Sequence, residues 1–193
     1  YETAAFLGSG CEISDAKDVA LANEICDDLG MDTIRAGITC SFAMECYEKG
    51  LVENWEGFKL KWGNAEAQRE LLKKMAYHQG IGNLFCDGTR VASQKIGKRS
   101  EEFAINIFGM EISGVNLKGV LQWGIAMAVA DFASHTRLWL TEAEAGPDFK
   151  IEDIPQAVAE GLDTINARNC LIICDFVPFG LDRLAPILNA LTG

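Results

Sequence analysis

The sequence lacks the features that mark several classes of protein. It has only four prolines among 193 residues, no low-complexity tract and 49% apolar residues, so we expect a folded globular chain. No apolar run approaches membrane-spanning length and no signal peptide is visible, so no membrane association is expected. Basic residues are few, 17 against 28 acidic ones, and the net charge of −11 argues against binding to nucleic acid or anionic membranes.

Local catalytic motifs are also missing: there is no Gly-rich phosphate loop, no zinc-ligand spacing and no nucleophile–base pair. The seven cysteines are odd in number and irregularly spaced, which is typical of thiols in a reducing compartment, and we expect a cytoplasmic protein. Cys170 and Cys174 are four residues apart without a second pair, so buried cysteines explain them more simply than a metal. A lone histidine such as His135 is either a packed core residue or a proton-transfer group.

The pattern that is present is helical. Apolar residues keep helical spacing up to Leu29 after the N-cap Asp15, and Gly30 supplies a left-handed residue that ends a helix. Asp32 is a good N-cap for a second helix over 33–48. Further helices are expected after Asn64, over 82–97 as two short pieces, over 118–131 as a buried small-residue helix, after Asp153 and near 181–191. With short strands at 58–61 and 103–108, the predicted fold is all-α and multihelical.

The break between the first two helices, residues 27–32, places a carboxylate at each end of one tight turn. Asp27 and Asp32 are suited to accept hydrogen bonds from the N–H and NH₂ edge of a heterocyclic ligand. By spacing alone, a helix–Gly–helix corner with solvated acids is the commoner explanation.

Several blocks, in order and in spacing, resemble the aldehyde ferredoxin oxidoreductase family. They are Tyr1-Glu2-Thr3, Asn23-Glu24 through Asp27-Asp28-Leu29-Gly30-Met31-Asp32-Thr33, Phe42-Ala43-Met44-Glu45, Tyr47-Glu48-Lys49-Gly50-Leu51, Leu60-Lys61-Trp62-Gly63-Asn64-Ala65-Glu66-Ala67, Lys74-Met75-Ala76-Tyr77 and Gly109-Met110-Glu111. The resemblance implies a tungsten (or molybdenum) bis-pterin cofactor beside a [4Fe–4S] cluster. It also implies oxidation of aldehydes to carboxylic acids, with ferredoxin as the electron acceptor.

The resemblance further implies that residues 1–193 are the largely helical C-terminal-type domains, with a sub-boundary near 100–117 and without the N-terminal pterin-binding domain. The start at Tyr1 without a methionine predicts an excised domain or a processed piece. We therefore expect the isolated chain to bind no cofactor and to be inactive. For the parent enzyme we expect ferredoxin as a protein partner and a small aldehyde as the substrate. The missing N-terminal domain would contact this part of the chain, and a homo-oligomer is a further expectation.

Site residues follow from the resemblance one at a time. Asp27 and Asp32 match the family's pterin motif Asp-x-x-Gly-Leu-Asp, with methionine replacing leucine. The second motif, Asp-x-x-Gly-Leu-Cys, lies at 169–174, where Asn169 replaces aspartate, Ile172 replaces glycine and Ile173 replaces leucine. The amide of Asn169 has a donor beside its acceptor oxygen, unlike the carboxylate of aspartate. Ile172 does not easily adopt the backbone angles that are open to glycine.

Cys174 resembles the fourth ligand of the iron–sulfur cluster, which it cannot hold alone. Glu2 and His135 resemble the family's acid/base pair near the metal, and Arg137 resembles a cation near the pterin. Two alternatives stay open: a related tungsten reductase resembling the catalytic subunit of aromatic acyl-CoA reductase, and a stand-alone helical domain for binding or assembly.

Overall fold

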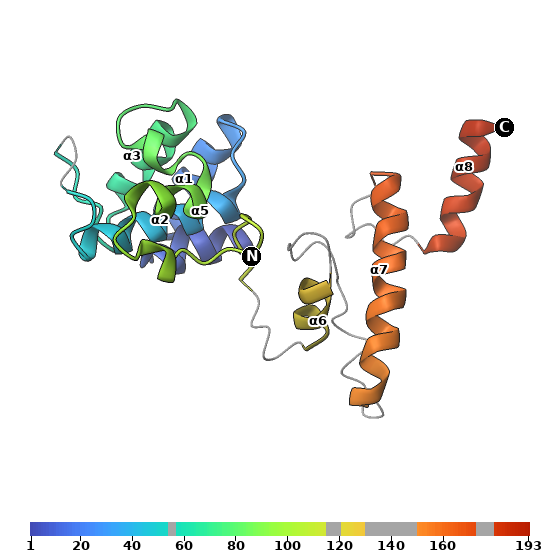
Figure 1. Cartoon of the computed structure of the whole chain (residues 1–193). Helices are drawn as coiled ribbons and strands as arrows, with labels where there is room; N and C mark the ends of the chain where they lie inside the picture. Colours follow the sequence, from blue (N-terminus) through green and yellow to red (C-terminus); the bar gives the residue numbers. More distant parts are fainter. Residues whose placement is uncertain (54–56, 115–120, 130–149, 173–179) are drawn as a thin grey trace. The chain divides into compact units, whose positions relative to one another are not determined.

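The computed structural model describes residues 1–53, 57–114, 121–129, 150–172 and 180–193 (Figure 1). The chain divides into two compact units, residues 1–114 and 115–193. The described residues are mostly helical and contain no β-strand, which confirms the prediction of an all-α fold. None of the described helices is long and apolar enough to cross a membrane.

The first unit is built from helices that begin and end close to their expected positions. Asp15 caps the first long helix by accepting from the backbone N–H of Lys17 at 2.8 Å, and Gly30 follows its end with φ +67°. The second helix ends at Glu48, as predicted from Asp32 and the Lys49-Gly50 signal. In chain order the helices are η1 (Ala4–Gly8), η2 (Ser9–Cys11), α1 (Ala16–Asp28), α2 (Thr33–Glu48), α3 (Ala65–Ala76), α4 (Gly82–Phe85), α5 (Gly88–Ile96) and η3 (Ser100–Glu102).

The two short strands expected in this unit do not form. At 58–61, the Lys59 carbonyl accepts from the Asn64 side chain at 2.9 Å and from the backbone N–H two residues later, so the backbone bends. At 103–108, the Asn106 side chain donates to the Ala104 carbonyl at 2.7 Å, which removes an acceptor that a neighbouring strand would need. Local side-chain bonds to the backbone compete here with strand pairing.

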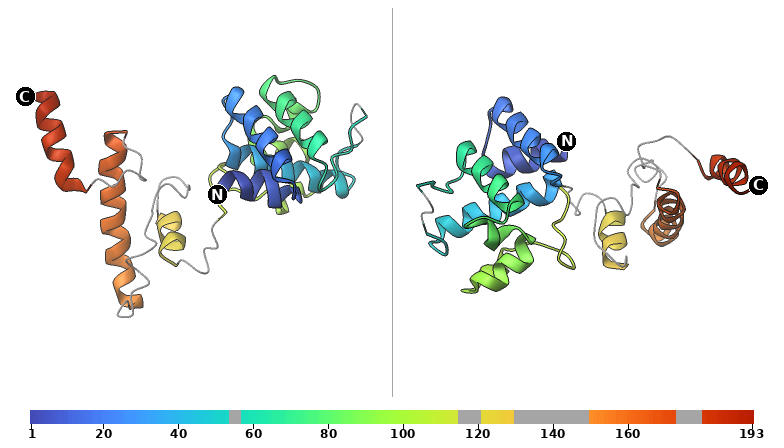
Figure 2. Two further views of the ribbon diagram at one scale, coloured as in Figure 1. Left: turned by 180° about the vertical axis from the view of Figure 1, so that it is seen from behind. Right: turned by 90° about the horizontal axis from the view of Figure 1, so that it is seen from above.

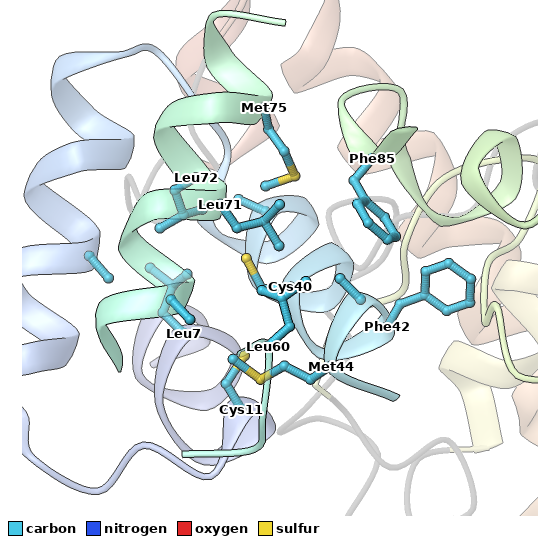
Figure 3. Packing of buried hydrophobic residues seen from close by; sticks show 14 of the residues in the cluster. Leu7, Cys11, Cys40, Phe42, Met44, Leu60, Leu71, Leu72, Met75 and Phe85 are labelled. Atoms are coloured by element: carbon cyan, nitrogen blue, oxygen red, sulfur yellow. The ribbon is translucent and has the colours of Figure 1, made fainter. Parts of the chain in front are cut away.

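The core of the first unit lies around α2, and Figure 3 shows its packing at close range. Cys40 of α2 faces Leu71 of α3, while Phe85 of α4 packs edge-to-face on the Phe42 ring of α2 with centroids 6.2 Å apart. Figure 2 shows α1 and α3 side by side. The buried cysteines of this core are Cys11, Cys26, Cys40 and Cys46. They are neutral thiols, since burial raises the pKa of a thiol.

The N-terminal helix approaches α2 unusually closely at Gly37. A Cβ added to this buried glycine would lie 2.6 Å from both the carbonyl carbon and the Cβ of Phe6. One turn earlier, the hydroxyl groups of Thr3 and Thr33 are hydrogen-bonded at 2.9 Å. The absence of a side chain at Gly37 therefore lets the first residues of the chain lie against the start of α2.

The second unit is described in three parts. Proline at the second position of α7 suits a helix start, and the backbone N–H of Lys150 donates to Asp153 at 3.3 Å just before it. One face of α6 is buried through Trp123 and Ala126, while the other exposes Ile125, so the expectation of a buried helix holds for one face only. The helices are α6 (Leu121–Val129), η5 (Ile151–Asp153), α7 (Ile154–Cys170), η6 (Leu181–Arg183) and α8 (Leu184–Thr192).

We predict that Gly37→Ala destabilises the protein, although alanine is normally favoured over glycine inside a helix by about 0.5–1 kcal/mol. The new methyl group would collide with the Phe6 backbone, and overpacking of this kind costs about 1–3 kcal/mol. Urea unfolding followed by circular dichroism measures the change. Gly124→Ala in α6 is the control, since a Cβ there has open space among the described residues and should be neutral or stabilising. A Gly37→Ala protein as stable as the wild type would contradict the close approach.

Candidate functional site

The turn between α1 and α2 is a complete glycine-ended helix cap. The Met31 N–H donates to the Cys26 carbonyl at 2.8 Å and the Gly30 N–H donates to the Asp27 carbonyl at 3.3 Å, the two bonds of a Schellman motif. Among the described residues, no atom beyond the chain neighbours of Gly30 lies within 4 Å of the place where its Cβ would be. One side of the turn is thus bare backbone that a flat ligand is able to approach.

The two carboxylates of the turn are both exposed and both already have partners. Asp32 caps α2 by accepting from the backbone N–H groups of Ile34 and Arg35 at 3.3 and 3.2 Å. Asp27 accepts from the Asn23 amide at 2.9 Å. A carboxylate has about four acceptor positions, so each retains capacity for a ligand.

Cys26 lies beneath the same turn. Burial, together with the negative charges of Asp27 and Asp32, raises the pKa of this thiol to about 11. The Cys26 side chain therefore stays protonated at neutral pH, and it is a packing residue rather than a metal ligand.

The carboxylates line different hollows. Asp32 lines a cavity of about 470 Å³ between the start of α2, the end of α3 and the α4–α5 corner, with Arg35 and His78 among its polar lining residues. Asp27 lines another hollow over the exposed side of α1 together with Lys17. A single ligand held by both acids would therefore lie across the turn rather than inside one cavity.

An ion pair that sequence reasoning missed shapes the cavity beside Asp32. The Glu111 carboxylate is fully buried and accepts from Arg35 Nε at 2.7 Å, from the Thr89 N–H at 2.7 Å and from the Thr89 hydroxyl at 3.0 Å. Gly88, with φ +85°, makes room, since a Cβ there would lie 2.6 Å from Glu111 Oε1. The contact joins residues 76 positions apart, and no local pattern signals it. Glu111 thus attaches the start of α5 to the start of α2.

Glu2 lies at the same end of α2. Its neighbour Thr3 is hydrogen-bonded to Thr33, the residue after Asp32. Glu2 Oε2 accepts from the Gly114 N–H at 3.1 Å. The fold therefore brings the segment of Glu2 to the turn that carries Asp32.

The other predicted motif begins at the end of α7, where Asn169 is exposed. The Ile172 N–H donates to the Asn169 carbonyl at 3.0 Å, and Ile172 has φ +55° with its side chain 94% exposed. The backbone thus repeats the left-handed residue seen at Gly30, but with a β-branched side chain for which that conformation is a genuine outlier. The remaining predicted site residues, His135, Arg137, Ile173 and Cys174, lie outside the described residues. Within the described ranges, no group of three or more His, Cys, Asp or Glu side chains is placed to hold a metal ion.

Residues 1–193 match the model of a protein family described as "Aldehyde ferredoxin oxidoreductase, domains 2 & 3". Tungsten-containing aldehyde ferredoxin oxidoreductases of Pyrococcus furiosus and Thermococcus kodakarensis are 28% and 29% identical over 206 residues, covering 100% of this chain and 34% of each relative. A P. furiosus protein named aliphatic sulfonate oxidoreductase, WOR-like subunit, is 25% identical over 199 residues, covering 100% of this chain and 30% of its own. The chain thus spans about a third of the length of these curated relatives.

We predict that Ile172→Gly stabilises the end of α7. The left-handed conformation costs a non-glycine residue about 1–2 kcal/mol, and glycine's larger loss of chain entropy offsets only part of that gain. Amide hydrogen exchange over the last turn of α7 should slow by roughly fivefold, equivalent to about 1 kcal/mol. Ile172→Val keeps the branched side chain and should show no gain. Equal exchange in the Gly and Val variants would show that Ile172 is not strained.

Proposed function

The chain belongs to the aldehyde ferredoxin oxidoreductase family, and from that membership we propose that it is part of a tungstopterin and iron–sulfur oxidoreductase. The reaction proposed for the parent protein is oxidation of an aldehyde to a carboxylic acid, with ferredoxin accepting the electrons. The observation that carries this proposal is the family match over the whole of residues 1–193. The relatives are about three times longer, so we propose that other domains complete the cofactor site and that this part alone is inactive.

The turn at 27–32 fits a pterin. Asp27 and Asp32 are exposed acceptors suited to the N–H and NH₂ groups of such a heterocycle, and the bare backbone at Gly30 admits a flat ring. We propose that these two carboxylates orient one pterin by hydrogen bonds. The Arg35–Glu111 pair would keep the adjoining cavity in shape while the pterin is bound.

The turn at 169–172 fits less well, because the exposed Ile172 side chain stands where the other turn is open. We therefore propose that contact with a pterin here uses the Asn169 amide and the neighbouring Ile173, not an open glycine surface. Cys174 remains the proposed cluster ligand as a thiolate, and Arg137 a proposed cation near the pterin.

The chemistry proposed for this chain's own residues is proton transfer. The tungsten group, when bound, would take up the two electrons that leave the aldehyde as its carbon gains an oxygen from water. Protons released in the same reaction need acceptors, and histidine titrates near neutral pH. We assign this role to His135 together with Glu2, whose Oε1 has no hydrogen-bond partner among the residues that the structure describes.

A second substrate class is favoured by one observation. The relative named as an aliphatic sulfonate oxidoreductase matches the whole chain at an identity close to that of the aldehyde enzymes. An aliphatic sulfonate is therefore the second candidate substrate for the same cofactor. Turnover of the full-length protein on aldehydes and on aliphatic sulfonates, measured side by side with reduced ferredoxin as the readout, separates the two.

We predict that His135→Ala and Glu2→Gln in the full-length protein each lower kcat by about 10²–10⁴-fold, the usual contribution of a positioned acid or base. Tungsten and iron contents should stay at wild-type levels, since neither residue is proposed to hold the metal. Turnover normalised to bound tungsten is the measurement. If the variants lose metal or stability but turn over normally per tungsten, the two residues serve the fold and not the reaction.

A further inference from the structure

The described part of the first unit ends at Gly114, and three side chains of the N-terminal segment hold this residue. Glu2 Oε2 accepts from the Gly114 N–H at 3.1 Å, and the Tyr1 hydroxyl donates to the Gly114 carbonyl at 3.0 Å. The Phe6 ring closes the remaining side, since a Cβ on Gly114 would lie 3.4 Å from its edge and 3.1 Å from Glu2 Oε2. The N–H and the carbonyl of Gly114 are thus both hydrogen-bonded, the N–H to Glu2 and the carbonyl to Tyr1.

We propose that Tyr1 and Gly114 are positioning residues that orient the Glu2 carboxylate for proton transfer, an inference that rests on the catalytic role proposed above for Glu2. The Gly114 N–H fixes Oε2, and the other oxygen, Oε1, has no hydrogen-bond partner among the described residues. The Tyr1 hydroxyl donates to the carbonyl of the same residue, which disfavours movement of the Gly114 N–H away from the carboxylate. One oxygen of Glu2 is therefore held by a structural hydrogen bond, and the other is the one proposed to transfer a proton.

The position of Tyr1 is set by its hydrogen bond to Gly114 more than by burial of its ring. Within the described part of residues 1–193, the polar contact of the Tyr1 side chain is the hydrogen bond from its hydroxyl to Gly114, and the residue is 86% exposed. An exposed neutral hydrogen bond contributes little to global stability. A carboxylate on a flexible three-torsion side chain, by contrast, loses much of its rotational freedom when one oxygen is fixed. The contact therefore matters for where the carboxylate lies more than for whether the protein folds.

The spacing at Gly114 supports the same conclusion. A Cβ there would lie 3.1 Å from Glu2 Oε2, a tight contact, and in ordinary van der Waals contact with the Phe6 ring. Phe6 is also the residue whose backbone meets Gly37, so Glu2, Gly114 and the start of α2 are linked through one aromatic residue.

The test uses the full-length protein and two readouts. We expect Glu2→Ala to speed amide exchange at Gly114 by about tenfold, as for the loss of a hydrogen bond to a charged acceptor, whereas Glu2→Gln keeps an acceptor and retains most of the protection. Tyr1→Phe should lower kcat by about fivefold, the smaller loss expected for a neutral hydrogen bond that acts through the position of Glu2, with KM and tungsten content unchanged. Tyr77→Phe is the matched control, since this exposed tyrosine lies at the end of α3 and outside the clamp formed by Tyr1, Glu2 and Gly114.

The outcomes separate the clamp from the proposed function. Unchanged Gly114 exchange in Glu2→Ala overturns the clamp, and wild-type kcat in Tyr1→Phe overturns its positioning role. Glu2→Gln is the discriminating variant, because it should keep the clamp while losing turnover. If the full-length protein oxidises no aldehyde, the proposed function fails, and the exchange measurement still decides whether Glu2 holds Gly114.

Discussion

The close approach of the N-terminal helix to α2 is the contact on which the candidate site depends. A single hydrogen atom at Gly37 lets the Phe6 backbone lie against the helix, and the Thr3–Thr33 hydrogen bond sets the register. With that register, Glu2 lies at the end of α2 that Asp32 caps. A residue proposed for proton transfer and a residue proposed for cofactor binding are thus placed together by backbone packing.

The two turns that resemble pterin motifs have the same backbone conformation but differ in the side chain that covers it. Gly30 and Ile172 both follow a helix in the left-handed region, with φ +67° and +55°. Gly30 adopts it freely and leaves one side open, whereas Ile172 adopts it at a cost and covers that side with an exposed apolar group. Backbone strain such as that at Ile172 persists only where the surrounding structure stabilises it. Of the two turns, the one at Gly30 has the open side that suits a flat ligand.

Local signals predicted the helices well and the long-range contacts not at all. Asp32 and Gly50 gave the bounds of α2 because capping is chemistry between neighbouring residues. The strand expected at 103–108 was wrong because the Asn106 side chain bonds the backbone locally, a competition that alternation of apolar residues does not reveal. The Arg35–Glu111 pair and the Gly114 clamp join residues 76 and 112 positions apart, and only the folded chain brings them together. The family resemblance supplied the candidate residues, and their roles remain proposals.

The central claim, that the turn at 27–32 holds the cofactor through Asp32, is tested most directly by tungsten and pterin content. Asn and Asp are about equally good N-caps, so Asp32→Asn should still cap α2 through its one acceptor oxygen and change the unfolding midpoint little. The new NH₂ group, by contrast, is a donor and cannot accept a hydrogen bond from the N–H and NH₂ groups of the pterin. We predict that tungsten and pterin per full-length protein fall by on the order of tenfold in Asp32→Asn. Asp15→Asn, the same change at the cap of α1, should leave both at wild-type levels. An Asp32→Asn protein with full tungsten and pterin content would contradict the claim.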